Sequence, residues 1–238
     1  MKRFITLVVI LFSISCEDDL LNVNQINIDS FLSENYLTDC HELYVREILA
    51  NPNHPNSSTP ILDTEELQKI MTVFQLIYDL KIPERDTVFH YYSINALKCH
   101  SLNSIVMKVN PDASEIKNLV KGNIPTGNIK LDNILTSYSF NSVETSYGYP
   151  KFPWLSVNTD NFYNLKPIIE AFKKLPCVTI AENNGGCFDG NNIMLERNNN
   201  QATVSFSIGR GDCPAGCTYR RTWIFRIINN KATFLKSY

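Results

Sequence analysis

The chain of 238 residues lacks an apolar run long enough to cross a membrane. A membrane-spanning helix needs about 20 consecutive apolar residues. The longest apolar run, Phe4–Phe12, is interrupted only by Thr6 but is much shorter than that, and no later stretch approaches this length. We therefore predict that the mature protein does not span a membrane.

An excess of positive charge is also missing. Lys and Arg number 22 against 24 Asp and Glu, which gives a net charge of −2 at pH 7. A dedicated nucleic-acid-binding protein carries a basic footprint, so no nucleic-acid partner is predicted. Charged residues make up 19% of the chain and hydrophobic residues 44%, a balance that is typical of a globular protein and not of a disordered one.

Catalytic and cofactor motifs are absent as well. Neither the Gly-x-Ser-x-Gly pattern nor the His-Glu-x-x-His pattern occurs. The segment Gly209-Arg210-Gly211 has neither the following helix nor the further glycines of a nucleotide-binding loop. Only four histidines are present for acid–base chemistry. The sequence therefore predicts no cofactor and favours a protein that is not an enzyme.

The beginning of the chain, in contrast, has the features of an export signal. Lys2 and Arg3 precede the apolar run Phe4–Phe12, and small residues follow before Cys16. A positive start, a short apolar core and small residues at the cleavage site are typical of a secretory signal peptide. Residues 1–15 are therefore predicted to be removed during export.

The segment Ser13-Ile14-Ser15-Cys16 resembles the lipobox of bacterial lipoproteins in its looser, Bacteroidota form. The resemblance covers the leader alone. It implies cleavage before Cys16, acylation of that cysteine, for example with palmitate, and attachment to the outer membrane on its periplasmic or cell-surface side. Acidic residues 17–19 look like the signal that sends such lipoproteins to the surface. Two or more acyl chains are enough for stable anchoring.

Two alternatives to lipidation remain at this point. Ser13 departs from the strict lipobox, which has a Leu-like residue there, and Ser-Ile-Ser also suits an ordinary signal peptidase. Secretion without a lipid is therefore the first alternative. An uncleaved cytosolic protein is the second.

Cysteine parity agrees with lipidation. The sequence has seven cysteines, and an odd number in an exported protein leaves one to be explained. Lipid on Cys16 leaves six cysteines that could form disulfides in an oxidising compartment. Many pairings are possible. Proximity along the chain favours Cys177–Cys187 and Cys213–Cys217, which leaves Cys40–Cys99 as a long-range bridge.

Hydrophobic periodicity predicts an α+β fold, with helices and a carboxy-terminal antiparallel β-meander. Residues 16–35 are polar and are predicted to form a lipidated tether. Residues 36–158 are predicted to be a mixed α/β region. Residues 159–238 are predicted to be a helix packed on an antiparallel sheet, in the same domain as 36–158 or in a separate one. A helix followed by a meander resembles cystatin-like and related α/β-roll topologies.

Local patterns predict the individual elements. Helices are expected at 36–50 (where a strand is the alternative), 64–80, 113–121 and 162–175, and strands at 87–96, 103–109, 177–182, 193–197, 202–208, 219–228 and 232–236. Asn229-Asn230 suits a tight hairpin turn, because Asn tolerates a positive φ. Residues 123–158 are expected to be loops with one or two short strands.

Charge is distributed unevenly along the chain. Residues 17–176 hold 20 acidic and 13 basic side chains, whereas residues 177–238 hold 4 acidic and 7 basic ones. The simpler interpretation is that the two parts attract each other within the fold. The functional interpretation is an anion-binding or partner-binding face on the carboxy-terminal sheet.

The loop at 209–217 and the strand after it contain the candidate binding site. Glycines and a proline make the loop tight, and a Cys213–Cys217 disulfide would close it, so one interpretation is a stapled hairpin tip. The functional interpretation is a rigid loop that presents arginines to an anionic ligand or a partner protein. The candidate binding residues are Arg210, Arg220, Arg221 and Trp223.

Two further hypotheses concern function. A hydrolase or metal-dependent enzyme could have its site near Cys40, His41 and His100, because a Cys40–Cys99 bridge would bring the two histidines together, with Glu42 as a further metal ligand. The simpler interpretation is a pair of surface histidines beside a disulfide. The other hypothesis is a purely structural envelope protein.

Overall fold

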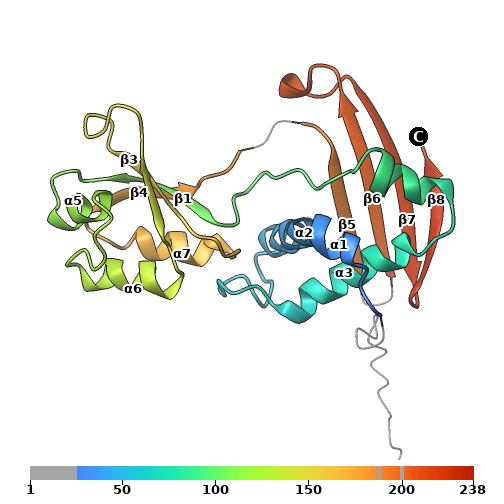
Figure 1. The fold of residues 1–238 in the computed structure, drawn as a ribbon, viewed down its shortest axis with the longest axis horizontal. Helices are drawn as coiled ribbons and strands as arrows, with labels where there is room; N and C mark the ends of the chain where they lie inside the picture. The colour runs from blue at the N-terminus through green and yellow to red at the C-terminus, as the bar shows by residue number, and fades with distance from the viewer. Residues whose placement is uncertain (1–25, 187–188, 199–200) are drawn as a thin grey trace, which may run out of the picture.

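The structure is a computed structural model that describes residues 26–186, 189–198 and 201–238. The described chain forms two lobes (Figure 1), each with helices packed on one four-stranded antiparallel sheet. The predicted α+β class is confirmed. None of the helices in these ranges is long and apolar enough to cross a membrane.

The sheet A lobe is built from the middle of the chain. Its strands are β1 (Ser104–Val109), β2 (Ser142–Thr145), β3 (Trp154–Asn158) and β4 (Val178–Asn183), in the antiparallel order β2-β3-β1-β4. Its helices are α5 (Ser114–Val120), α6 (Ile129–Ser137) and α7 (Leu165–Phe172). Ile105 and Met107 on β1 and Phe172 on α7 are fully buried, and they belong to one hydrophobic core.

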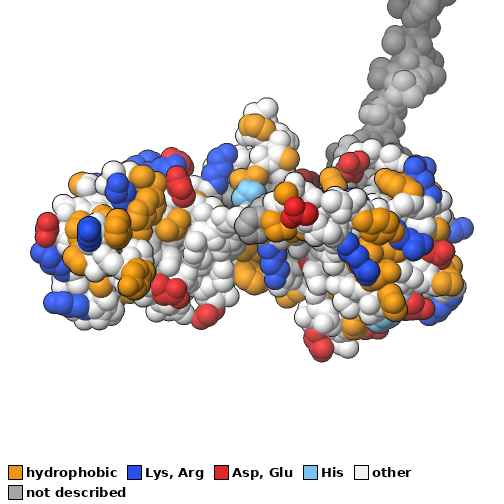
Figure 2. All heavy atoms as spheres, turned by 90° about the horizontal axis from the view of Figure 1, so that it is seen from above, with side chains coloured by type: hydrophobic (Ala, Val, Ile, Leu, Met, Phe, Trp, Pro, Cys, Tyr) orange, Lys and Arg blue, Asp and Glu red, His pale blue; other side chains and the backbone are white. Residues whose placement is uncertain are grey.

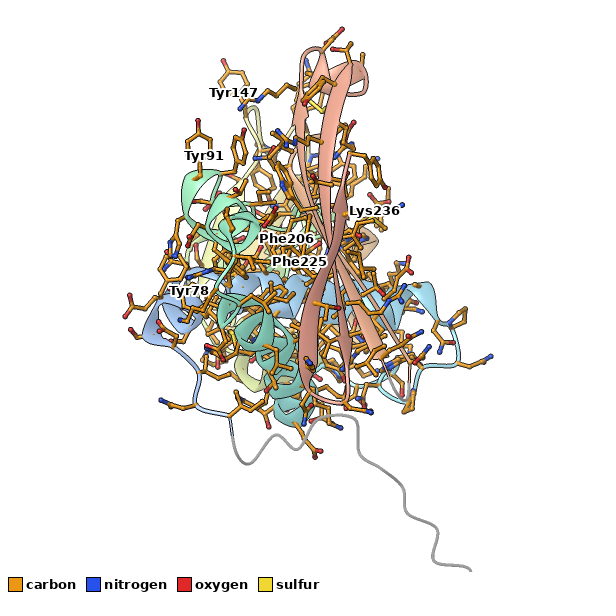
Figure 3. All side chains as sticks on the ribbon, turned by 90° about the vertical axis from the view of Figure 1, so that its right-hand side faces the viewer. Tyr78, Tyr91, Tyr147, Phe206, Phe225 and Lys236 are labelled. Carbon is orange, nitrogen blue, oxygen red and sulfur yellow. A yellow bond between two sulfur atoms is a disulfide. The ribbon has the colours of Figure 1, made fainter. Side chains whose placement is uncertain are left out.

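The sheet B lobe takes its strands from the end of the chain. They are β5 (Asn192–Asn198), β6 (Gln201–Arg210), β7 (Tyr219–Ile228) and β8 (Lys231–Ser237), each antiparallel to the next. The predicted carboxy-terminal meander is therefore confirmed. Asn229 and Asn230 have the positive φ values, 48° and 57°, that the predicted turn requires. Phe206 and Phe225 point toward the helices, whereas Lys236 lies on the other side of the sheet (Figure 3).

Helices from the beginning of the described chain cover sheet B. They are α1 (Ser30–Asn35), α2 (Leu37–Ala50), α3 (Thr64–Tyr78), α4 (Pro83–Asp86) and the π-helical turn η2 (Thr87–Tyr91). Asp63 caps α3 by accepting a hydrogen bond from the Glu65 backbone N–H at 2.9 Å. Ile70, Phe74 and Ile77 lie at the spacing of one helical face and are fully buried in the core shared with the sheet.

The chain first forms the helices of the sheet B lobe, then the whole sheet A lobe, and finally the strands of sheet B. The helices over the carboxy-terminal sheet therefore come from the other end of the chain. Helix α7, which the sequence predicted to pack on that sheet, instead buries Ile168 and Phe172 in the sheet A core. Strand β4, predicted to be the first strand of the meander, pairs with β1. The topology thus differs from a cystatin-like helix and meander that are consecutive in the chain.

The folded domain begins earlier than the predicted tether allowed. Residues 16–25, including the lipidation candidate Cys16, lie outside the described residues. Residues 30–35 form α1, which Asp29 caps by accepting from the Phe31 backbone N–H at 2.9 Å. Leu32 on this helix is fully buried. This part of the predicted tether is therefore wrong, because its apolar side chain contributes to the core of the sheet B lobe.

The predicted strand at 87–96 is also wrong, since it begins as the helical turn η2. Val88 and Phe89 are consecutive and both fully buried. A strand would have directed them to opposite faces, whereas a helical turn allows both to enter the core. The Phe89 ring lies 5.1 Å from the Tyr36 ring and 5.3 Å from the Phe206 ring, measured between centroids. Tertiary packing has overridden the β-propensity of this segment.

Candidate functional site

Strands β6 and β7 extend beyond the helices (Figure 1). Arginine and aromatic residues occur on both strands near the loop that joins them. In the register of the two strands, Phe206 faces Trp223 and Arg210 faces Tyr219. Alternate residues of a strand share one face, so Arg210, Arg221 and Trp223 all lie on the face turned toward the helices. Hydrophobic and basic side chains lie side by side on this lobe (Figure 2).

The two arginines on this face are stacked on aromatic rings. The guanidinium carbon of Arg210 lies 5.7 Å from the centroid of the Tyr92 ring, and that of Arg221 lies 5.1 Å from the Trp223 ring. Tyr92 in turn lies 4.6 Å from Tyr91 and 5.5 Å from Trp223, measured between ring centroids. We call these five residues the arginine–aromatic surface. Stacking of this kind holds a guanidinium in place and leaves its N–H edge available to a carboxylate.

A pocket of about 360 Å³ opens between this surface and the helical layer. Tyr91 and Tyr92 line it from the helical side, and Arg221 and Trp223 line it from the sheet. Trp223 is almost completely buried, whereas 78% of Tyr91 is exposed. The pocket therefore has a fixed aromatic wall and one ring that solvent surrounds.

The charges of the surface are incompletely neutralised. Two other arginines of sheet B, Arg197 and Arg220, form ion pairs with carboxylates. Arg210 and Arg221 form none within the described ranges. Glu84 also lines the pocket, so the site has a basic residue on the sheet side and an acidic residue on the helical side.

Arg220 is separated from the other candidate binding residues, because it lies on the opposite face of β7. Its guanidinium donates to the Ser207 hydroxyl at 2.9 Å and the Gly190 carbonyl at 3.0 Å, and it forms an ion pair with Asp189. Asp189 also accepts from the Cys217 backbone N–H at 2.8 Å. This hydrogen bond and the Arg220 guanidinium hold the pKa of Asp189 below its usual range. Arg220 therefore supports the loop at the tip of the sheet and does not join the arginine–aromatic surface.

The tyrosines and Glu84 of the site were missed by sequence reasoning. Tyr91 and Tyr92 fall in the segment that was predicted to be a strand of another region. The only local signal was the pair of adjacent aromatic residues after Pro83. Nothing in the sequence indicates that this pair lies beside Trp223.

The structure confirms one predicted disulfide, Cys213–Cys217, in the loop between β6 and β7. Cys40 and Cys177 are free and buried, so the predicted bridges Cys40–Cys99 and Cys177–Cys187 are wrong. The reason is that Cys40 lies in the core of the sheet B lobe and Cys177 in that of the sheet A lobe. Cys99 is itself disulfide-bonded, and Cys187 lies outside the described residues.

We expect the thiols of Cys40 and Cys177 to resist alkylation in the folded protein. Burial raises the pKa of the Cys40 thiol far above its usual range, and burial together with the charge of Glu115 raises the pKa of the Cys177 thiol to about 11. The thiolate is the reactive form of cysteine. Iodoacetamide should therefore modify both residues only after the protein has been unfolded in the absence of reductant, and peptide mapping would identify the modified residues. Modification of either one in the folded protein at neutral pH would contradict this expectation.

Of the residues of the enzyme hypothesis, Glu42 and His100 line one pocket, but Cys40 and His41 do not join them there. Cys40 has no exposed surface. His41 packs edge-on against Phe162, with 5.1 Å between the ring centroids, whereas His100 is exposed. Within residues 26–186, 189–198 and 201–238, no group of three or more His, Cys, Asp or Glu side chains is arranged to hold a metal ion. The proposed metal cluster of His41, His100 and Glu42 is therefore not formed.

His41 gives a pH-dependent prediction. Burial lowers the pKa of His41 below 6.5, although the Leu37 carbonyl, 2.7 Å from Nδ1, acts in the opposite direction. The folded state then binds fewer protons than the unfolded state between the two pKa values, so stability falls as the pH drops through this window. The melting temperature of the natural protein should fall more between about pH 8 and about pH 5 than that of the His41→Gln variant. Equal decreases would contradict the prediction.

No protein-family model matches this chain, and searches among curated proteins and among solved structures find no match either.

Proposed function

We propose that this protein is an exported bacterial lipoprotein, anchored to the outer membrane by lipid on Cys16, which captures an acidic segment of a partner protein. The proposed binding site is the arginine–aromatic surface. One observation carries the proposal: Arg210 and Arg221 are stacked on aromatic rings and have no carboxylate partner within the described chain.

Physical chemistry favours an acidic partner over an apolar one. A guanidinium held by an aromatic face loses little side-chain freedom when it binds a carboxylate in two-point geometry. The neighbouring aromatic rings provide the large, well-packed contacts that dominate protein interfaces. Exposed guanidiniums also attract acidic partners at long range, and this effect weakens as salt is added.

Binding to a defined peptide tests the proposal. A fluorescent poly-Glu peptide should bind the mature protein in an anisotropy assay, and a poly-Gln peptide of the same length should not. The Arg210→Gln/Arg221→Gln variant should bind at least about tenfold more weakly, the loss expected for charge-assisted hydrogen bonds.

An arginine on the opposite face provides the control. Arg226→Gln removes an exposed guanidinium of the same strand that faces away from the helices. The affinity of this variant for poly-Glu should stay close to that of the natural protein. Equal losses in the Arg226 variant, or unchanged binding in the Arg210/Arg221 variant, would exclude this surface and favour a structural envelope role.

Glu84 offers a change in the opposite direction. This residue lines the pocket, and its negative charge repels an acidic partner. Glu84→Gln should therefore increase the affinity for poly-Glu, by about two- to threefold for one partly exposed charge. A decrease in affinity would indicate that Glu84 itself binds the partner.

The lipid anchor is tested by the mass of the protein purified from its native membrane. The fragment that begins at Cys16 should carry the added mass of acyl chains and should lack residues 1–15. The Cys16→Ala variant should lose membrane attachment. A native protein that begins at Met1, or an unmodified Cys16, would refute this part of the proposal.

A further inference from the structure

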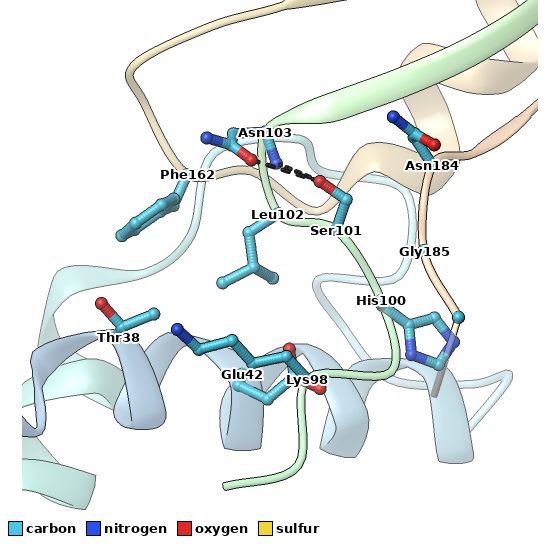
Figure 4. A pocket seen from close by; sticks show the side chains of 11 residues that line it. Thr38, Glu42, Lys98, His100, Ser101, Leu102, Asn103, Phe162, Asn184 and Gly185 are labelled. Atoms are coloured by element: carbon cyan, nitrogen blue, oxygen red, sulfur yellow. Dashed lines mark hydrogen bonds between the residues drawn. The ribbon is translucent and has the colours of Figure 1, made fainter. Parts of the chain in front are cut away.

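A polar cleft of about 640 Å³ lies between the two lobes. Helix α2 forms one side with Thr38 and Glu42, and the chain segments that connect the lobes form the other side (Figure 4). Leu102 and Phe162 give the cleft an apolar part. The arginine–aromatic surface contributes no residue to it, so this site is independent of the one proposed above.

Glu42 has an unpaired carboxylate oxygen in the lining of this cleft. Its side chain is 1% exposed. Oε1 accepts a hydrogen bond from Arg46 Nε at 3.0 Å, but the buried Oε2 receives no hydrogen bond from the described chain. A buried carboxylate oxygen without a donor is energetically costly, so the site is suited to a ligand that supplies one.

Arg46 cannot supply the missing hydrogen bond in this arrangement. Its Nη1 donates to the Asn192 side chain at 3.0 Å and to the Ile193 carbonyl at 3.1 Å, and its Nη2 donates to the Leu97 carbonyl. These bonds fix the guanidinium between α2, β5 and the connecting segment. The remaining acceptor of Glu42 is therefore left to a molecule in the cleft.

Lys98 places the opposite charge in the same cleft. Its side chain is exposed and forms no ion pair with the described residues, and it lines the cleft from the segment that connects the lobes, whereas Glu42 lines it from α2 (Figure 4). A lysine side chain and a buried carboxylate with a free acceptor therefore line one cavity. Together they complement a ligand that carries both a donor and an anionic group.

The two chain segments that connect the lobes lie very close to each other, so the side of the cleft that they form cannot change shape easily. A Cβ atom added at Gly185 would meet the Cys99 carbonyl oxygen at 2.7 Å and the Ser101 backbone nitrogen at 2.8 Å. Asn183 also joins the two segments, because its side chain accepts from Ser101 N–H at 2.7 Å and donates to the Ser101 carbonyl at 2.8 Å. The cleft thus has a preformed wall, as ligand sites commonly do.

We infer that the cleft binds a small zwitterion of the free amino-acid type, with its ammonium group on Glu42 Oε2, its carboxylate on Lys98 and its side chain against Leu102 and Phe162. No bond is made or broken in this interaction. The charge pattern of the cleft distinguishes such a ligand from a simple amine or a simple carboxylic acid, each of which would satisfy only one of the two groups.

Titration calorimetry on the mature chain tests the inference. Pools of free L-amino acids are used first, and then the best single binder with its methyl ester and its N-acetyl derivative. The amino acid should bind at least about tenfold more tightly than either derivative, because each derivative loses one charged contact. Glucose serves as an uncharged, hydroxyl-rich probe.

Two variants assign the contacts. Lys98→Met should weaken binding of the amino acid by about tenfold and leave binding of its methyl ester unchanged. Glu42→Gln should weaken binding of the amino acid and leave binding of the N-acetyl derivative unchanged. Glu34→Gln and Lys121→Met, at exposed positions outside the cleft, are the matched controls. Lys98 is exposed, so its variant remains informative even if Glu42→Gln unfolds the protein.

Several results would overturn the inference. With the natural protein, these are no binding of any amino-acid pool, binding of glucose alone, or derivatives that bind as tightly as the parent amino acid. With the Lys98→Met variant, it is an unchanged affinity for the amino acid. None of these results would bear on the arginine–aromatic surface, because the two sites share no residue and use different probes.

Discussion

Replacing Asn164 with Ala is expected to lower the free energy of unfolding by about 2–4 kcal/mol. Asn164 is completely buried at the start of α7. Its Oδ1 accepts from the Lys166 backbone N–H at 3.3 Å and so caps the helix. Its Nδ2 lies 3.2–3.4 Å from three carbonyl oxygens of the loop that precedes α3, those of Asn56, Ser57 and Thr59.

The substitution therefore removes two interactions of different kinds. Loss of a helix cap costs about 1 kcal/mol, and loss of the hydrogen bonds that the buried Nδ2 donates to the loop adds about 1–3 kcal/mol. Asn164→Ser separates the two, because Ser caps helices well but cannot donate to the loop. The Ser variant should recover about 1 kcal/mol of the loss seen with Ala. A Ser variant as stable as the natural protein in urea denaturation would show that the contacts with the loop contribute nothing.

Phe206→Ala is expected to have the largest effect on stability, about 3–5 kcal/mol. Phe206 is fully buried in the sheet B lobe, and its ring lies 5.3 Å from that of Phe89 and 5.8 Å from that of Phe225. Removing it leaves a cavity among aromatic rings that cannot collapse easily. Phe152→Ala is the control, because the Phe152 side chain is 56% exposed and its loss should cost less than about 0.5 kcal/mol.

The two tryptophans of the chain allow each lobe to be followed separately. Trp154 lies on β3 in sheet A and Trp223 on β7 in sheet B. In urea denaturation followed by fluorescence, Phe206→Ala should shift the Trp223 transition of a Trp154→Phe background. The Trp154 transition is followed in a Trp223→Phe background. If Phe206→Ala shifts this transition as much as the Trp223 transition, the two lobes unfold together. If Phe206→Ala leaves the Trp223 transition in place, the assignment of Phe206 to the central packing of its lobe is wrong.

The sequence was sufficient wherever one local pattern determines an element. Strand β7 was predicted at its observed bounds, because Trp223, Phe225 and Ile227 recur at every second position, and the residues between them, Ile224 and Arg226, are partly buried and exposed. Helix α3 was predicted because its apolar residues, such as Ile70, Phe74 and Ile77, recur at helical spacing. Helix α6 was missed in the Gly- and Pro-rich segment around it. Its cap at Asn128 and its buried Leu131 and Leu135, four residues apart, were visible signals.

The sequence was insufficient wherever distant segments meet. Three features depend on which apolar faces pack together. They are the insertion of the sheet A lobe, the place of β4 in sheet A and not in sheet B, and the burial of Cys40 and Cys177 in different cores. Proximity along the chain carries no information on that choice. The candidate site shows the same division, since Arg210, Arg221 and Trp223 were identified from their own loop and strand. Tyr91 and Tyr92 reach them only through the folded core.

The insertion of one lobe into the other determines the order in which the protein can be completed. The Asn184 backbone N–H donates to the Ser104 carbonyl at 3.1 Å, so the entry and exit of the inserted lobe are adjacent. Residues 104–183 can therefore close their own core as soon as they emerge during synthesis. The apolar faces of α2 and α3 emerge earlier but stay uncovered until β8 follows at the end of the chain. A newly made molecule thus passes through a stage with one finished lobe and one open lobe, and in that interval a holding chaperone would have a surface to bind.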